Sequence, residues 1–255
     1  MSPDFSQAVD PGAVRLTDLP ITAGTNRIRV VITDQAGRRT ELFLPLYSSI
    51  DLLAQGLWTF NLEGGAERQQ YAIESNDYGP VFGSAAAGFG VSDRLTVRGY
   101  GAAADGYWMG ALGTTFAIGN FLLAEATGMY SQGPEGDGWA WYGSVEHVSQ
   151  RLNLFASYMH SSSGFRDLAG HFGYTVVTDQ AIVSGGLNLD RFGTLNVAYV
   201  LQRELDGDQS SLLSGTYGID LFDRQVHFSL SGYTELTEGD WGADVSLTFP
   251  LSRRA

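Results

Sequence analysis

The stretch NRIRVVITDQAGRRTELFLPLYSS, residues Asn26–Ser49, decides the fold together with LLAQGLWTFNLEGG, residues Leu52–Gly65, which follows it. Within the first stretch, Asn26–Asp34 and Arg38–Leu44 are two β-rich runs, and the QAG between them favours a tight turn. From the second stretch onward, the chain repeats alternating runs of about ten residues separated by turns. The sequence therefore predicts a small β module, with a hairpin over Asn26–Leu44, followed by a long meander.

The meander is predicted to contain twelve strands, each ending at a polar or glycine-rich turn. They are Leu57–Gln70, Val81–Val91, Arg94–Ala104, Tyr107–Ile118, Phe121–Ser131, Trp139–Val148, Leu152–Ser162, Asp179–Leu189, Thr194–Glu204, Gln209–Phe222, Gln225–Leu236 and Trp241–Pro250. The predicted fold class is all-β, an antiparallel up-and-down sheet.

In the later strands, apolar residues occupy every second position, which places them on one face because successive side chains of a strand point to opposite faces. The residues expected on this face are Leu195, Val197, Tyr199, Leu201, Val226, Phe228, Leu230, Val245, Leu247 and Phe249. A soluble sandwich and a membrane barrel both have such strands, so the periodicity alone leaves both open. No stretch approaches the ~20 consecutive apolar residues of a membrane helix, but barrel strands leave no such trace.

The connections between the predicted strands alternate in length. The short set is Ser92-Asp93, Gly119-Asn120, Ser149-Gln150, Asp190–Gly193 and Asp223-Arg224. The other set, mostly longer, is Asp105-Gly106, Gln132–Gly138, Ser163–Thr178, Leu205–Asp208 and Thr237–Asp240. Outer-membrane barrels have short turns at one end and longer loops at the other, whereas sandwiches mix connection lengths. This pattern favours a transmembrane barrel.

Composition narrows the function further. The net charge is -13, and a surface that binds nucleic acid needs clustered positive charge, so nucleic acid is not an expected partner. The chain has no cysteine, which rules out disulfides and thiolate metal sites. Residues Met1–Asp10 lack the basic start and apolar core of a secretory signal, so an outer-membrane location would make this chain a piece of a longer protein.

Three consecutive segments, PGAVRLTDLP (Pro11–Pro20), Asn26–Ser49 and Leu52–Gly65, together resemble the fimbrial outer-membrane ushers of the chaperone–usher pathway. In that family, the matching segments are the last strands of the plug domain, the linker that leaves it, and the barrel strand that follows. The resemblance implies that residues 1–50 are the C-terminal part of a plug domain with its linker. It also implies that residues 57–252 are a partial transmembrane β-barrel.

The resemblance also implies a function. The chain would be part of a pore that assembles and translocates pilus subunits in the outer membrane of a Gram-negative bacterium. The expected partners are pilus subunits, periplasmic chaperone–subunit complexes and outer-membrane lipid. Two other classes stay open from the residues themselves: a general porin or autotransporter-type barrel, and a soluble β-rich surface adhesion protein.

The sequence contains no recognisable catalytic, cofactor-binding or metal site, and we expect no enzyme activity and no cofactor. His147, His160, His171 and His227 fall on different runs without metal-ligand spacing. The sequence Asp206-Gly207-Asp208 lacks the downstream carboxylates of a calcium loop and is expected to be a polar turn.

Two further features have ordinary structural interpretations. Glu125 and Glu146 are expected to line the barrel interior rather than to act as an acid–base pair, and the small residues Ala85–Gly90 are expected where the sheet is crowded or tightly curved. Aromatic residues near strand ends fit a membrane–water interface, although they are also common in ordinary sheets. They are Trp58, Tyr107, Trp108, Trp139, Trp141, Tyr158, Tyr199, Tyr233 and Trp241.

Overall fold

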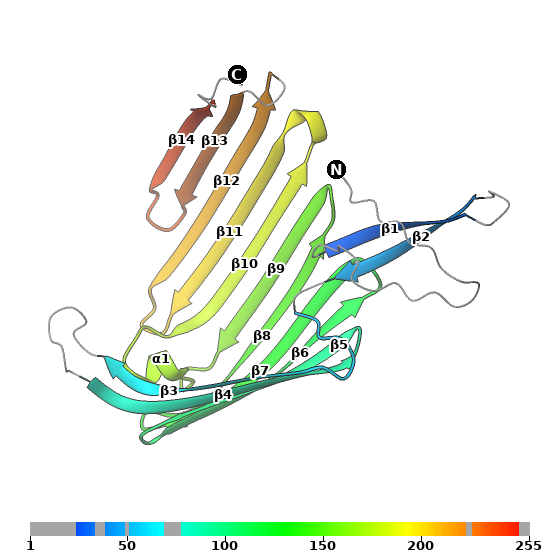
Figure 1. Cartoon of the computed structure of the whole chain (residues 1–255). Helices are drawn as coiled ribbons and strands as arrows, with labels where there is room; N and C mark the ends of the chain where they lie inside the picture. Colours follow the sequence, from blue (N-terminus) through cyan, green and yellow to red (C-terminus); the bar gives the residue numbers. More distant parts are fainter. Residues whose placement is uncertain (1–23, 34–38, 49–50, 69–77, 223–225, 250–255) are drawn as a thin grey trace.

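The computed structural model describes residues 24–33, 39–48, 51–68, 78–222 and 226–249. Strands β1 (Gly24–Thr33) and β2 (Arg39–Ser48) pair antiparallel in a sheet of their own, separate from all later strands (Figure 1). This pairing confirms the predicted hairpin, although its QAG turn lies outside the described residues. The assignment of the hairpin to a plug domain stays a prediction.

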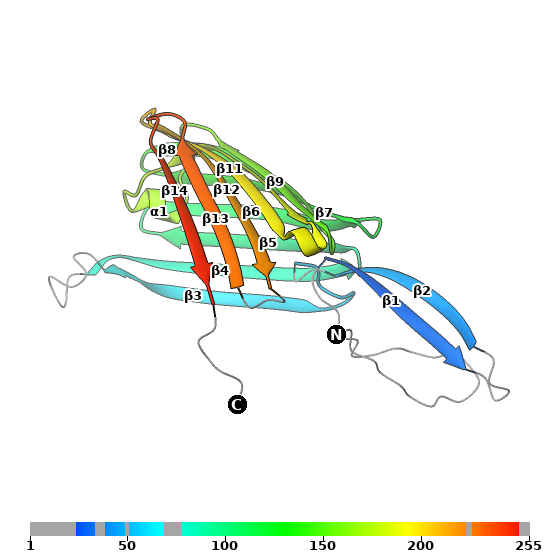
Figure 2. The same ribbon diagram turned by 90° about the horizontal axis from the view of Figure 1, so that it is seen from above.

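The remaining strands form one antiparallel sheet of twelve, in which every strand pairs with its neighbours in sequence. They are β3 (Trp58–Arg68), β4 (Tyr78–Ser92), β5 (Leu95–Ala104), β6 (Tyr107–Ile118), β7 (Leu122–Gly133), β8 (Gly136–Val148), β9 (Leu152–Ser161), β10 (Val177–Asn188), β11 (Thr194–Glu204), β12 (Gln209–Leu221), β13 (Val226–Glu235) and β14 (Trp241–Thr248). All twelve predicted strands and the up-and-down order are confirmed. Figure 2 shows the sheet curved into an open trough.

One predicted loop is wrong. Residues 132–138, expected to be a longer connection, extend β7 and β8 instead, because the ladder continues through Gln132 opposite Asp137 to Gly133 opposite Gly136. Gly136 adopts φ +117°, which only glycine reaches easily, so the chain turns within two residues. The Gly- and Pro-rich composition was typical of a loop and hid a tight hairpin.

The two ends of the sheet therefore differ less than expected. Among the described connections at the predicted long end, residues 162–176 form the long one, and they include a short helix, α1 (Leu168–His171), that the sequence did not predict. The other end is not uniformly tight either, since a 3₁₀ turn at Asp190–Phe192 separates β10 from β11. The alternation in connection length is therefore present, but the contrast between the two ends is weaker than the sequence predicts.

The strand registers divide the sheet into two faces. Directly paired residues share a face, and Leu195 pairs with Tyr217, which pairs with Leu230, which pairs with Val245. Nine of the ten residues expected on one face are confirmed there, and Phe249 lies just beyond β14. We call this side the apolar face, and the side that carries Thr96, Thr115, Glu125 and Ser144 the polar face.

Burial on the two faces is the reverse of that in a soluble protein. On the apolar face, Phe60 is 83% exposed and Leu112 is 65% exposed. On the polar face, the hydroxyl-bearing side chains of Thr96 and Thr115 are almost completely buried. A soluble sandwich would bury its apolar face as a dry core, so this arrangement fits a sheet whose surroundings are themselves apolar.

The sheet is open rather than closed. Within the described residues, β3 pairs with β4 and β14 pairs with β13, while the two end strands do not pair with each other (Figure 1). No helix among the described residues has the length and apolar character needed to cross a membrane.

The face assignment predicts unequal tolerance of charge at adjacent residues of β13. Leu230→Arg places a charge on the apolar face, whereas Ser231→Arg places it on the polar face. In the full gene product that carries this sequence, L230R is expected to lower the free energy of unfolding in lipid by about 2–4 kcal/mol if it lies near the bilayer midplane. S231R should cost clearly less, and equal costs would show that the face assignment is wrong.

Candidate functional site

A row of hydrogen-bonded side chains crosses four strands of the polar face. Thr96 of β5 pairs with Thr115 of β6, which pairs with Glu125 of β7, which pairs with Ser144 of β8. Thr115 Oγ1 donates to Glu125 Oε1 at 2.9 Å, and Ser144 Oγ donates to Glu125 Oε2 at 3.3 Å. Both oxygens of this carboxylate therefore accept hydrogen bonds from the wall itself.

Arg98 completes this row. Its Nη1 atom donates to Thr115 Oγ1 at 2.7 Å and lies 3.9 Å from Glu125 Oε1. Its Nη2 atom donates to the backbone carbonyl of Asp51. One guanidinium thus bridges the carboxylate of the wall and the chain that enters the sheet, a geometry for which the forked, permanently charged Arg is suited.

The chain that enters the sheet lies along this wall. We call residues Asp51–Leu57 the anchor segment. The Leu53 amide donates to Thr96 Oγ1 at 2.8 Å, and the Gln55 amide donates to Asp93 Oδ1 at 3.0 Å. Together with the Arg98 contact, these bonds tie the segment to β5 and to the turn before it.

Two glycines of β4 make room for the anchor segment. A Cβ atom at Gly90 would lie 2.2 Å from the Ala54 carbonyl oxygen, and one at Gly88 would lie 3.3 Å from Leu53 Cδ1. In addition, the Gly56 amide donates to the Gly90 carbonyl at 2.8 Å, and the Gly90 amide donates to the Leu57 carbonyl at 2.9 Å. The small residues of Ala85–Gly90 therefore lie at a crowded position, as expected, and the structure supplies the reason.

The long connection of residues 162–176 covers the opposite end of the same strands. Phe165 is buried on the polar face against Ala102, Tyr107, Met109 and Ala140. The Tyr107 hydroxyl donates to the Arg166 carbonyl at 3.0 Å, and the Arg166 amide donates to Ser131 Oγ at 2.9 Å. The loop thus packs onto the polar face instead of extending away from the sheet.

The aromatic residues at the strand ends divide between the two faces. The Trp108 ring lies tilted against Tyr130, and the Trp141 ring against Tyr158, all on the apolar face and at the end that carries the 162–176 connection. Tyr107 is different: it lies on the polar face and packs under Phe165. Tyr233, paired with Ser214, also lies on the polar face. The interfacial interpretation was therefore wrong for these two tyrosines.

The histidines occupy separate places. His160 and His227 each contact one carboxylate, Asp179 and Asp220, with 2.8 Å between the nitrogen and the oxygen. His171 stacks on the Tyr107 ring, and His147 contacts the Phe121 carbonyl. The Glu125 carboxylate is held by hydroxyls and Arg98, and its paired neighbour is Ser144, while Glu146 is paired with Leu123. The structure therefore brings none of these residues into a catalytic arrangement with another.

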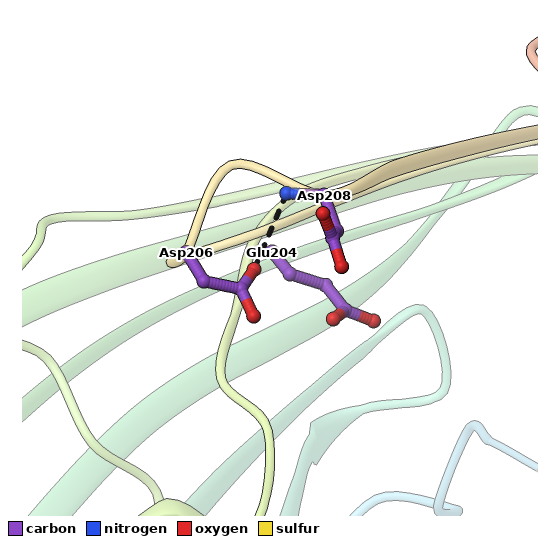
Figure 3. A group of neighbouring side chains, drawn as sticks. All are labelled: Glu204, Asp206 and Asp208. Atoms are coloured by element: carbon purple, nitrogen blue, oxygen red, sulfur yellow. Dashed lines mark hydrogen bonds between the residues drawn. The ribbon is translucent and has the colours of Figure 1, made fainter.

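Within the described parts of the chain, one group of three acidic side chains lies close enough to share a metal ion. The carboxylate oxygens of Glu204, Asp206 and Asp208 lie within 4.8 Å of one another (Figure 3). Asp206 Oδ1 accepts a hydrogen bond from the Asp208 amide at 3.2 Å, as in an ordinary polar turn. The predicted turn is confirmed. Glu204 was not expected in this acidic group, because it is the last residue of a strand.

These features define a class of protein. The sheet is wide and antiparallel. One face is apolar and exposed, and the anchor segment and the 162–176 connection pack against the other, polar face. This is the wall of a membrane-spanning barrel pore, in which the polar face lines the interior.

Comparison with known proteins identifies the family. Residues 5–253 match the family described as outer membrane usher protein. The chain is similar to the outer membrane usher proteins AfaC and AggC of Escherichia coli, with 29% and 26% identity over 172 and 171 residues. Each of these matches covers 64% of this chain and 20% of the relative. The chain therefore belongs to the outer-membrane usher family, and its location is the outer membrane.

Solved structures share the fold. The P pilus usher (PapC) translocation pore superposes with a TM-score of 0.63 at 20% identity, covering 91% of this chain and 50% of that one. An E. coli P pilus tip assembly intermediate, PapC-PapD-PapK-PapG, gives a TM-score of 0.64 at 19% identity, covering 89% of this chain and 30% of that one. This chain thus corresponds in fold to part of an usher barrel.

The close approach at Gly90 predicts a specific effect of one methyl group. Gly90→Ala forces the anchor segment away from β4, and we expect it to lower the free energy of unfolding by about 1–3 kcal/mol. The amides of Gly56 and Leu53 should then exchange faster with solvent. Gly128→Ala is the control, because a Cβ atom there meets nothing within 4 Å. Equal exchange in both variants would contradict the packing described above.

Proposed function

We propose that this chain forms part of the pore of an usher that assembles pilus subunits and translocates them across the outer membrane. The observation that carries the proposal is the mixed inner wall of β9–β12, which presents hydroxyl and amide side chains. They are Asn153, Ser184, Asn196, Ser214 and Thr216. These polar groups lie among the apolar side chains of the same face, Phe155, Ile182, Val200 and Leu212, and interrupt the apolar surface to which a folded protein would adhere.

The partners follow from the same proposal. One solved structure with this fold is a P pilus tip assembly intermediate of E. coli, PapC-PapD-PapK-PapG. Pilus subunits and periplasmic chaperone–subunit complexes are the partners we propose, with outer-membrane lipid against the apolar face and no nucleic acid. We also propose that this part of the pore has no enzyme activity of its own.

The domain division is part of the proposal. Residues 1–50 would be the C-terminal part of a plug domain with its linker, and residues 57–252 a partial barrel. The separate pairing of β1 with β2 supports this division, as does the change to a single continuous sheet from β3 onward.

Loss of the gene product tests the function and separates it from a porin. Deleting the gene from its host should abolish surface fibres and leave chaperone-bound subunits in the periplasm. Restoring the gene should restore the fibres. If deletion leaves surface fibres unchanged and instead lowers the uptake of small solutes, the porin alternative replaces the proposal.

The proposal also fixes an orientation. If the plug leaves the barrel on the periplasmic side, β3 runs outward, and the end with the 162–176 connection faces the cell exterior. The chain has no cysteine, so single cysteines can report the side. In the full gene product on intact cells, an impermeant thiol reagent should label Ser163→Cys and not Gln150→Cys. Labelling of Gln150→Cys alone would reverse the orientation.

A further inference from the structure

We propose that the anchor segment is a fixed attachment held by Arg98, so that it stays with the barrel wall in any movement of the N-terminal module. The consequence for gating rests on the proposed function, because only a pore with a movable plug needs a fixed attachment for it. The attachment itself rests on the contacts of four residues in the wall: Gly90, Asp93, Thr96 and Arg98.

The backbone of the anchor segment continues the sheet. The β3–β4 ladder reaches Trp58 opposite Phe89, and the bonds of Gly90 with Gly56 and Leu57 extend it by one further step. A released segment would leave both backbone groups of Gly90 without these partners. Unpaired backbone groups are costly away from bulk water, which favours a segment that stays in place.

The segment also covers a buried hydroxyl. Thr96 is completely buried, and its Oγ1 atom accepts the hydrogen bond from the Leu53 amide. The Leu53 side chain also packs where Gly88 has no side chain, because a Cβ atom at Gly88 would lie 3.3 Å from Leu53 Cδ1. Lifting the segment would therefore expose an apolar side chain and remove a partner from a buried polar group in the same step.

Arg98 is the positioning residue of this attachment. Its two terminal nitrogens donate in different directions, one to Thr115 and one to the Asp51 carbonyl, and Glu125 lies close enough to balance its charge. A Lys ammonium is a single point of charge on a flexible stem and cannot reproduce two fixed donors. The contact with Asp51 is also the most N-terminal of these attachments, so the part of the chain that is held to the wall begins at this residue.

A disulfide tests whether the segment stays in place during function. In the full gene product, Leu53→Cys and Thr96→Cys together introduce two thiols into a stretch of 255 residues that has no cysteine, where the Leu53 amide contacts the Thr96 side chain. The oxidised pair should form readily and leave fibre assembly at the level of the reduced pair. Assembly that stops on oxidation and returns with reductant would show that the segment must be released, and would overturn the proposal.

The resting pore supplies a readout that does not depend on fibre assembly. Arg98→Gln should raise the resting ion conductance of the purified full gene product in planar bilayers several-fold, and Arg98→Lys should fail to restore it. Arg203→Gln is the matched control, because that Arg contacts Gln209 and Asp179 on the other face.

Heat-modifiable migration on gels shows which variants are folded. A folded Arg98→Gln variant with unchanged conductance would overturn the role of Arg98. If Arg98→Gln fails to fold, proteolysis of folded Thr96→Val decides instead: unchanged protection of the Asp51–Leu57 segment overturns the attachment, and faster cleavage supports it. If the wild-type gene product forms no fibres but Arg98→Gln still raises its conductance, the proposed function is wrong and the attachment stands.

Discussion

The structure depends on one constraint: within a lipid bilayer, every backbone donor and acceptor must find a partner in the protein. An antiparallel ladder of twelve neighbouring strands satisfies this requirement through backbone pairs, except along the outer edges of β3 and β14, which pair with no further strand among the described residues. The side chains are then free to divide by face, with apolar groups such as Phe60 and Leu112 outside and hydroxyls such as Thr96 and Thr115 inside. A soluble protein would have the opposite distribution, with apolar side chains inside. The distribution seen here is the one that lipid around the sheet requires.

The polar face also holds two other parts of the chain in place. Its row of Thr115, Glu125 and Ser144 holds Arg98, and Arg98 in turn holds the chain that comes from the N-terminal hairpin. The long connection covers the other end of the same strands through Phe165 and Tyr107. Both additions to the wall thus use strands β4–β8, while the wall of β9–β12 presents small polar groups among apolar ones such as Ile182 and Val200.

Much of the fold could be predicted from the sequence, because alternation with period two is a local property that each strand carries by itself. The hairpin of β1 and β2, the twelve strands and the nine paired residues of the apolar face followed from it. The two-residue turn before Gly136 did not, because Gly- and Pro-rich composition is shared by tight turns and loops. Helix α1 is a single turn, too short for any periodicity to indicate.

The candidate site could not be predicted in the same way. Arg98, Thr115, Glu125 and Asp51 are distant in sequence, and only strand register brings them together. Glu125 was expected to line the interior, but nothing in the sequence indicated its contact with Arg98. Tyr107 was placed with the interfacial aromatics, because a sequence does not show which face a loop will fold against.

The central claim is that the two faces of the sheet have different surroundings, lipid on the apolar face and water on the polar face. Single spin labels at successive positions of β11, from Leu195 to Gln202, can measure this in lipid, because the chain has no other thiol. Labels at Leu195, Val197, Tyr199 and Leu201 should be relaxed by oxygen dissolved in the bilayer, and those at Asn196, Ala198, Val200 and Gln202 by a water-soluble nickel complex. Equal accessibility along the strand, or the opposite alternation, would contradict the account.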